Sequence, residues 1–307
     1  MSSIYIYSPS SAIVDKAAFK RGIKRLESLG HTVELDPTVL ARDTRFAGTD
    51  AQRIEAITRA AKSGADFAMI SRGGYGLTRL LPDLPYDFIA TAAQKGTKFI
   101  GFSDFTVFQA AVYAQTKTVT WHGPSVGADF GYQDEKTNLP DDILESCFED
   151  LSWDQSEGAG WRLPKDSPCL SQGNFVIDKA TLWGGNLCVL TSLLGTPYFP
   201  KINNGLLYLE DIAEHPYKIE RFLTQLLYSG VLAKQKAILL GQFTDYKLTP
   251  NDKGFNLKSV VEWLQSKVNV PILTGLPLGH VPTKVILPFG LKASLSVEQR
   301  EALIYWG

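Results

Sequence analysis

The chain has 307 residues, of which 44% are hydrophobic and 21% are charged, and its formal net charge is −1 at pH 7. These values are typical of a soluble globular protein that is long enough for two domains. A net charge near zero excludes a strong general attraction to nucleic acid or to an acidic membrane surface, so we expect neither as a partner. No apolar run reaches the roughly 18 residues of a membrane span, and the N-terminus lacks the pattern of a signal peptide. We therefore expect a cytoplasmic protein.

The first part of the chain alternates strand and helix patterns. Strands are expected over residues 4–7, 31–35, 65–70 and 98–100, and helices over 15–29, 50–62 and 86–95. This alternation predicts parallel strands joined by right-handed helical crossovers in an open, doubly wound sheet. Ligands of such sheets bind at the carboxyl ends of the strands.

The alternation fails between residues 127 and 171, where Asp, Asn, Gln, Glu, Gly and Pro are frequent and Trp153 and Trp161 stand among polar residues. We expect a loop-rich linker there. Further strand and helix patterns follow, with apolar strands at 205–209 and 237–241 and helices at 217–228 and 257–268. The predicted division is an N-terminal domain over 1–126, the linker over 127–171 and a smaller C-terminal α/β domain over 172–307.

The three cysteines, Cys147, Cys169 and Cys188, are odd in number and show no C-x-x-C spacing. They indicate a reducing compartment and argue against a disulfide framework or a zinc site. The four histidines show no His-x-x-x-His spacing either. We therefore expect no metal and no cofactor.

The run Gly101-Phe102-Ser103-Asp104 lies between an expected strand and an expected helix. A serine at such a sharp turn exposes its hydroxyl above the sheet, and the first N–H groups of the helix can hold a developing oxyanion. Ser and Asp are also good helix caps. The pattern alone therefore fits either a nucleophile at Ser103 or a plain helix start.

A glycine-rich segment, Arg72-Gly73-Gly74-Tyr75-Gly76, follows the preceding strand. It has neither the Gly-x-Gly-x-x-Gly spacing nor the Lys-Ser/Thr pair of a P-loop, so a dinucleotide site is not favoured. Adjacent glycines allow a backbone N–H to approach a ligand closely, as an oxyanion hole requires. A plain turn explains the glycines equally well.

Glu210 and Asp211 end an apolar strand, and His280 follows Gly279 in a loop after another buried strand. An unpaired buried carboxylate is costly, so Glu210 must be solvated, paired or functional. A carboxylate that orients a histidine holds its tautomer and stabilises the imidazolium, as in a catalytic triad. The alternative is a carboxylate that the dipole of the next helix favours.

Taken together, these motifs resemble the LD-carboxypeptidase family of serine peptidases, the muramoyltetrapeptide carboxypeptidases. The resemblance runs along nearly the whole chain and includes Ser71-Arg72-Gly73-Gly74-Tyr75-Gly76, Gly101-Phe102-Ser103-Asp104, Trp121-His122-Gly123-Pro124, Trp183-Gly184-Gly185-Asn186-Leu187, Leu209-Glu210-Asp211 and Gly279-His280. The chain order of Ser103, Glu210 and His280 is also the order in the family.

The resemblance implies a metal-independent enzyme of peptidoglycan recycling that removes the terminal D-alanine from a murein tetrapeptide by cutting the L,D bond. It also implies a flavodoxin-like N-terminal domain, a smaller C-terminal α/β domain and a homodimer. In this chain Ser103 would be the nucleophile, His280 the base and Glu210 the group that orients the base. The implied oxyanion hole consists of the backbone N–H groups of Gly73, Gly74 and Asp104.

The free carboxylates of such a substrate need cationic partners, for which Arg72 and Arg221 are candidates. Arg221 could equally pair with Glu214 or Glu220. Tyr75 and Trp183 could line the pocket, or they could pack in the core as large apolar residues often do.

Two other functions remain open. A related self-immunity peptidase, which destroys a peptidyl-nucleotide antibiotic such as microcin C, would share the triad but would need an aromatic platform for the nucleobase, and the tryptophans of the linker keep that role open. The first domain could instead be a non-catalytic module that binds a nucleotide or a sugar phosphate. A serine-directed fluorophosphonate distinguishes the classes, because a binding module would not be labelled at Ser103.

Overall fold

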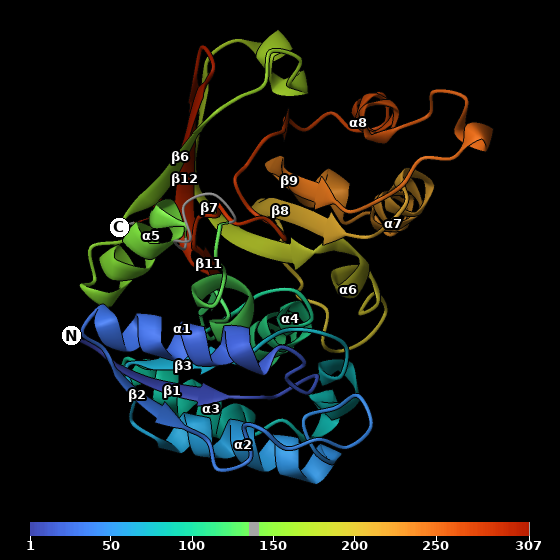
Figure 1. Ribbon diagram of the computed structural model, residues 1–307. Helices are drawn as coiled ribbons and strands as arrows, with labels where there is room; N and C mark the ends of the chain where they lie inside the picture. Colours follow the sequence, from blue (N-terminus) through green and yellow to red (C-terminus); the bar gives the residue numbers. More distant parts are fainter. Residues whose placement is uncertain (135–140, 307) are drawn as a thin grey trace. The chain divides into compact units, whose positions relative to one another are not determined.

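The computed structural model describes residues 1–134 and 141–306, which form two compact α/β units (Figure 1). The first unit comprises Met1–Ser156, Pro197–Pro200 and Pro282–Phe289. The second comprises Glu157–Thr196, Lys201–Val281 and Gly290–Gly307. The predicted fold class, a doubly wound sheet followed by a second α/β unit, is confirmed.

The sheet of the first unit has its described strands in the order β11-β5-β4-β3-β1-β2. Their bounds are β1 Ser3–Tyr7, β2 Thr32–Leu35, β3 Phe67–Ile70, β4 Lys98–Gly101, β5 Thr120–His122 and β11 Leu287–Phe289. Strands β1 to β5 pair in parallel, and β11 is antiparallel to β5. The order β2-β1-β3-β4-β5 is that of the flavodoxin-like fold.

Helices cover both faces of this sheet. Their bounds are α1 Lys16–Ser28, α2 Asp50–Lys62, η1 Leu77–Asp83, α3 Tyr86–Gln94, α4 Phe105–Thr116, η2 Val126–Phe130 and α5 Asp142–Ser152. α1, η2 and α5 share one apolar core with the strands, while α2, α3 and α4 pack side by side. Figure 1 shows α1 on the opposite face of the sheet from α2 and α3. Right-handed crossovers produce this arrangement of parallel strands and helices.

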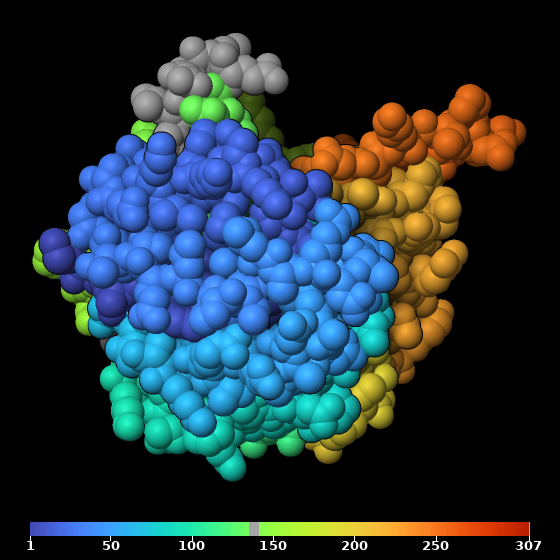
Figure 2. All heavy atoms as spheres, turned by 60° about the horizontal axis from the view of Figure 1, so that its bottom comes forward, coloured from blue at the N-terminus to red at the C-terminus, as the bar shows by residue number. Residues whose placement is uncertain are grey.

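The second unit is built on a mixed sheet whose described strands follow the order β10-β9-β8-β7-β12-β13-β6. The strands are β6 Gly158–Arg162, β7 Phe175–Asn186, β8 Gly205–Ile212, β9 Ala237–Thr244, β10 Ile272–Leu273, β12 Lys292–Glu298 and β13 Glu301–Tyr305. The helices are η3 Pro168–Gln172, α6 Leu187–Thr191, α7 Pro216–Tyr228, η4 Leu232–Lys234, η5 Pro250–Asp252 and α8 Leu257–Gln265. β7 to β10 are parallel, whereas β12, β13 and β6 continue the sheet in antiparallel pairs. The segment around η5 projects from the surface of this unit (Figure 2).

The segment 127–171 differs from the loop-rich linker that its polar composition predicts. It contains most of η2 and all of α5 in the first unit, and all of β6 and most of η3 in the second. α5 buries Leu144, Phe148 and Leu151 at helical spacing in the core of the first unit, and its acidic residues hide this pattern. Trp161 is buried in β6, where its indole N–H donates to the carbonyl of Thr274 at 3.1 Å.

Cys147, Cys169 and Cys188 are all free thiols. Within the described residues, no three or more His, Cys, Asp or Glu side chains lie together as a metal site would require. None of the described helices is both long enough and apolar enough to cross a membrane.

Candidate active site

Ser103 lies in the sharp turn that joins β4 to α4, and its backbone adopts a φ of 64°. This left-handed conformation costs a non-glycine residue about 1–2 kcal/mol and marks many functional turns. The turn is also crowded, because a Cβ on Gly101 would lie 2.6 Å from Cδ1 of Ile70. The side chain of Ser103 is half-buried, at the start of a helix that follows within two residues. The sharp strand-to-helix turn expected from the sequence is present.

The glycine loop after β3 lies directly beside Ser103. A Cβ added to Gly73 would lie 2.9 Å from Cβ and 3.2 Å from Oγ of Ser103, so only glycine fits there without displacing the serine. The two loops meet because β3 and β4 are neighbouring parallel strands. Within the described residues, the backbone N–H groups of Gly73, Gly74 and Asp104 donate no hydrogen bond to the protein. These groups therefore have the capacity to bind an oxyanion beside Ser103.

Asp104 supports the glycine loop and does not cap α4 with its side chain. Its buried carboxylate accepts hydrogen bonds from Oγ of Ser10 at 2.7 Å and from the N–H of Leu77 at 2.9 Å. Burial raises the pKa of Asp104. Ser10 also contacts the carbonyl oxygen of Gly74. Ser10, in the loop after β1, is therefore bonded both to the glycine loop and to the turn that carries Ser103. The sequence pattern indicated a helix cap at Asp104 but gave no signal for this contact.

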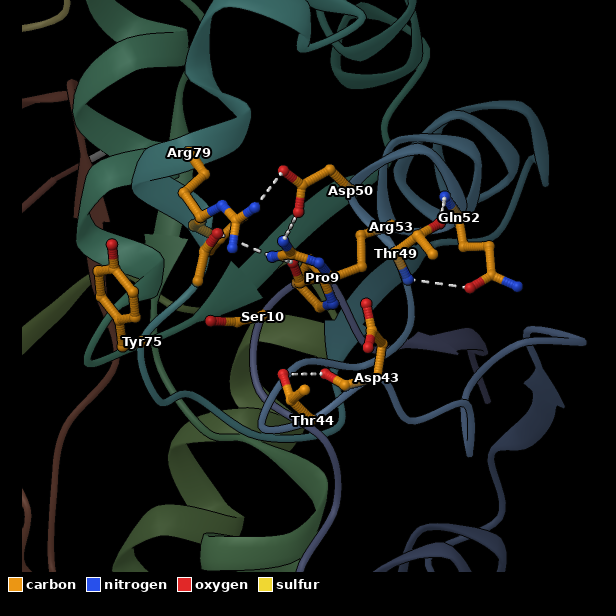
Figure 3. A network of polar contacts seen from close by, with 12 residues as sticks. Pro9, Ser10, Asp43, Thr44, Thr49, Asp50, Gln52, Arg53, Tyr75 and Arg79 are labelled. Carbon is orange, nitrogen blue, oxygen red and sulfur yellow. Dashed lines mark hydrogen bonds and ion pairs between the residues drawn. The ribbon is translucent and has the colours of Figure 1, made fainter.

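Arg53 of α2 forms hydrogen bonds with the loop after β1 and with the glycine loop after β3 (Figure 3). Its guanidinium is fully buried and donates to the carbonyl oxygens of Pro9 at 3.2 Å and Gly76 at 2.7 Å. Arg53 also pairs with Asp50, which in turn pairs with Arg79 at 3.0 Å. Sequence reasoning missed Arg53, although a basic residue on the buried face of an amphipathic helix was the available signal.

In the second unit, Glu210 and His280 form a hydrogen-bonded pair. Oε2 of Glu210 lies 2.8 Å from Nδ1 of His280, and the Glu210 side chain is fully buried near the carboxyl end of β8. The register of β8 against β9 shifts between Leu209 and Asp211, which places Glu210 in an irregular part of the strand. A carboxylate that accepts from Nδ1–H leaves the ring lone pair on Nε2. The position of the Glu210 carboxylate therefore favours the tautomer of His280 that a general base uses.

Two glycines make room for this pair. A Cβ on Gly241 would lie 2.5 Å from the carbonyl oxygen of Leu278, so the loop that carries His280 runs tightly against β9. Gly279 has a φ of 137°, and a Cβ there would lie 3.0 Å from the carbonyl oxygen of Gln242. The backbone N–H of Gln242 donates to the carbonyl of Leu278 at 2.8 Å. These contacts position His280 next to Glu210.

Pairing with a carboxylate does not by itself distinguish His280 from two of the other histidines. His31 pairs with Glu149 at 2.7 Å, and His215 pairs with Asp252 at 3.2 Å. In both of these residues the second ring nitrogen accepts a backbone N–H, which assigns them structural roles. The Glu149 side chain is also 31% exposed, whereas that of the partner of His280 is fully buried.

The side chain of Asp211 forms hydrogen bonds that connect the end of β8 to the start of α6. Its carboxylate accepts from Nδ2 of Asn186 and from the N–H of Cys188, both at 2.9 Å. Burial raises the pKa of Asp211 to about 6, and the neighbouring Glu210 charge also raises it. In the sequence, Asp211 stood out only as the neighbour of Glu210, and nothing in the pattern predicted these contacts.

Comparison with known proteins places these residues in one family. The N-terminal domain of LD-carboxypeptidases matches residues 4–123, which contain Ser103 and the glycine loop. The C-terminal domain of LD-carboxypeptidases matches residues 179–295, which contain Glu210 and His280. The chain belongs to the LD-carboxypeptidase family.

Three similar proteins illustrate the range of this LD-carboxypeptidase family. The probable murein peptide carboxypeptidase of Bacillus subtilis (strain 168) is 30% identical over 92% of this chain and 85% of its own. The solved muramoyltetrapeptide carboxypeptidase of Oxalobacter formigenes is 36% identical, covers 99% of this chain and 98% of its own, and has a TM-score of 0.86. The microcin C7 self-immunity protein MccF of Escherichia coli is 27% identical over 97% of this chain and 90% of its own.

The candidate substrate-binding residues of this LD-carboxypeptidase lie in different environments. Trp183 is fully buried and its indole N–H donates to Gln235 at 3.0 Å, which supports the core role that the sequence left open. Tyr75 is 49% exposed in the glycine loop. Arg72 is half-buried beside that loop, whereas Arg221 is exposed on α7 over an aromatic ring.

Proposed function

We propose that this member of the family is a serine carboxypeptidase that releases the terminal D-alanine of a murein tetrapeptide by hydrolysing the L,D bond. The observation that carries the proposal is the left-handed turn at Ser103 beside the Gly73-Gly74 loop. A serine held in this conformation above a parallel sheet has the geometry of a nucleophile elbow. The names of the relatives from Bacillus subtilis and Oxalobacter formigenes support the substrate class.

In the proposed mechanism, Oγ of Ser103 attacks the scissile carbonyl while Nε2 of His280 takes its proton. Glu210 holds the imidazole in the required tautomer and stabilises the imidazolium that forms. His280 then returns the proton to the leaving D-alanine, and water hydrolyses the acyl-enzyme by the same steps in reverse. The N–H groups of Gly73, Gly74 and Asp104 stabilise the oxyanion, and each such donor lowers the barrier by about 3–4 kcal/mol.

The covalent chain supports the proposal that His280 acts on Ser103. Lys284 follows His280 by four residues and belongs to the first unit. Its ammonium lies 4.1 Å from the ring centroid of Phe102, the residue before Ser103, and pairs with the buried Asp129. Because four extended residues span at most about 14 Å, the chain itself limits how far His280 can be from this turn.

We further infer a homodimer that acts in the cytoplasm without a metal ion. The family resemblance supports the dimer, and the free thiols of Cys147, Cys169 and Cys188 suit a reducing compartment. Light scattering tests the dimer, for which the expected mass is twice that of the chain. A mass equal to that of one chain at micromolar concentration would contradict it.

Mass spectrometry of a murein tetrapeptide incubated with the protein tests the proposed function. We expect the loss of one alanine, undiminished by EDTA and abolished in Ser103→Ala. Circular dichroism of Ser103→Ala verifies that the fold is intact. Turnover by Ser103→Ala at the wild-type rate would exclude this nucleophile, and a loss in EDTA that zinc reverses would exclude the metal-independent mechanism.

Relatedness to MccF favours one second candidate, a peptidase that acts on an aminoacyl or peptidyl nucleotide. The tryptophans considered for a nucleobase platform differ in exposure, since Trp161 is 8% exposed and Trp153 is 61% exposed. The same mass-spectrometric assay with a peptidyl-nucleotide substrate separates the two enzymes. Labelling of Ser103 by a fluorophosphonate would exclude a module that only binds nucleotides or sugar phosphates.

A further inference from the structure

A lysine is buried in the first unit against the residue that precedes the proposed nucleophile. Lys284 is only 2% exposed, and its ammonium pairs with the buried carboxylate of Asp129. The same ammonium lies 4.1 Å from the ring centroid of Phe102, which is also buried. Phe102 immediately precedes Ser103 in the turn between β4 and α4. The cation therefore contacts the residue that leads into this turn.

Stability alone does not account for a charged pair at this position. Taking an ammonium and a carboxylate out of water is costly, and a well-packed apolar pair of similar volume is often at least as stable. The carboxylate of Asp129 also accepts from the backbone N–H of Ser125 at 2.7 Å and from its Oγ at 3.1 Å. These bonds fix the carboxylate and, through it, the ammonium of Lys284. A fixed cation holds an aromatic ring in turn, because the face of the ring attracts positive charge.

The position of Phe102 affects the backbone on both sides of the turn. Its carbonyl oxygen accepts from the N–H of Phe105 at 3.2 Å, at the start of α4. A Cβ on Gly73 would lie 3.3 Å from the same oxygen, so the glycine loop also approaches Phe102 closely. The next residue, Ser103, has the left-handed φ of 64°. Such a conformation persists only where the surrounding contacts determine it, so a displaced Phe102 would disturb the serine.

We propose that Lys284 is a positioning residue for the nucleophile. Its ammonium, held by Asp129, keeps the ring of Phe102 in place and thereby keeps Ser103 in its strained conformation. Lys284 acts through Phe102 and takes no part in proton transfer. The inference rests on the proposed role of Ser103 in the carboxypeptidase reaction.

Lys284→Met tests this role, because methionine retains an unbranched side chain and removes the charge. Two rates are measured, namely kcat for D-alanine release from a murein tetrapeptide and the rate constant for labelling of Ser103 by a fluorophosphonate. Both should fall by about 10- to 100-fold and KM should change by less than about threefold, because a displaced nucleophile slows attack and leaves binding intact. Lys284→Arg should recover most of the loss, since a guanidinium also pairs with a carboxylate and lies over a ring.

A charge-neutral double variant separates positioning from stability. Lys284→Met alone leaves the carboxylate of Asp129 buried without its partner, which should lower the urea midpoint of unfolding. Lys284→Met/Asp129→Asn removes both charges, and asparagine keeps a side-chain oxygen for Ser125. Its urea midpoint should return close to the wild-type value, while kcat and the labelling rate stay low. The double variant carries the comparison if Lys284→Met fails to fold.

Lys62→Met is the matched control. The ammonium of Lys62 lies 4.1 Å from the ring centroid of Phe88 at an exposed site of the same unit, so the variant removes a lysine–aromatic contact of the same distance. It should change neither kcat nor the labelling rate.

The outcomes for Lys284 and for the proposed function are distinguishable. Wild-type kcat and labelling in Lys284→Met, or recovery of both rates together with stability in the double variant, would overturn the positioning role and leave the carboxypeptidase function in place. If the wild type neither releases alanine nor reacts with the fluorophosphonate, the proposed function itself fails.

Discussion

Ser103 and Asp104 are adjacent residues with separate tasks. The left-handed φ of Ser103 costs about 1–2 kcal/mol, which the surrounding contacts must offset. Asp104 contributes to that compensation, because its carboxylate binds Ser10 and Leu77 from two other loops. A helix cap at this position would satisfy only its own helix. The contacts of Asp104 instead tie the nucleophile turn to the rest of the first unit.

The carboxyl group of Asp211 should make stability depend on pH. Its pKa is raised from 3.8 to about 6 in the folded protein, so its contribution to stability is full below pH 3.8 and is lost as the pH rises through about 6. The loss amounts to about 3 kcal/mol at most. In Asp211→Asn this loss should be absent, so the free energy of unfolding, measured by urea denaturation, should decrease less than that of the wild type between pH 4 and pH 7.

The exposed Asp87 of α3 provides the matched control. Asp87→Asn should retain the wild-type pH dependence of the unfolding free energy. An unchanged pH dependence in Asp211→Asn would contradict the assignment of this titration to Asp211.

At the scale of elements, hydrogen bonds connect the loops after β1, β3 and β4 to one another. The loop after β1 contributes Ser10, and the loop after β3 contributes the glycines beside Ser103. Helix α2 adds the buried Arg53, which donates to carbonyls of the first two loops (Figure 3). Parallel strands bring these loops to one edge, and the buried hydrogen bonds then hold them in register.

Gly73→Ala tests the close approach of the glycine loop to the nucleophile. The new methyl group would lie 2.9 Å from Cβ of Ser103, closer than any normal contact, so either the serine or the loop must shift. We expect kcat to fall by at least about 100-fold through displacement of the nucleophile and one oxyanion donor. Steady-state kinetics on the murein tetrapeptide provide the measurement.

Gly160→Ala is the matched control, since its methyl group would meet no atom closer than 3.7 Å. It should retain activity and stability. Wild-type kcat in Gly73→Ala would show that the glycine is not needed beside Ser103.

At the scale of the whole molecule, the chain passes between the two units several times. The segment Pro282–Phe289 returns to the first unit only two residues after His280, where β11 pairs with β5 and Lys284 pairs with Asp129. The proposed base thus precedes a return of the chain to the first unit by two residues. The predicted division at residues 126 and 171 does not include this return.

A double-mutant cycle tests whether residues of the two units act together. Ser103→Ala and His280→Ala should each lower kcat by at least about 10⁴-fold, and the double variant should be no slower than the slower single variant, because triad members act as a unit. Glu210→Ala should be similarly non-additive with Ser103→Ala. Losses that multiply would indicate that Ser103 and His280 act independently.

The sequence predicted elements well where the pattern is local. The helix expected at 15–29 corresponds to α1 at Lys16–Ser28, and that at 217–228 corresponds to α7 at Pro216–Tyr228. The prediction was wrong for α5, whose acidic surface masks a buried stripe that only the core of the first unit reveals. Ser103 and His280 stood out because turn residues follow buried strands there. Arg53 did not, because its buried partners are backbone carbonyls of distant loops.

Local patterning by itself therefore determined the doubly wound fold and the turn at Ser103, because hydrophobic periodicity and turn chemistry depend on near neighbours. The family was indicated by the resemblance of motifs along the chain. Tertiary structure alone decided that Gly73 approaches the serine, that Glu210 is fully buried against His280, and that Arg53 bonds to the loops after β1 and β3. Each of these facts joins residues that are far apart in the chain, and their burial and distance exist only once the sheets have assembled.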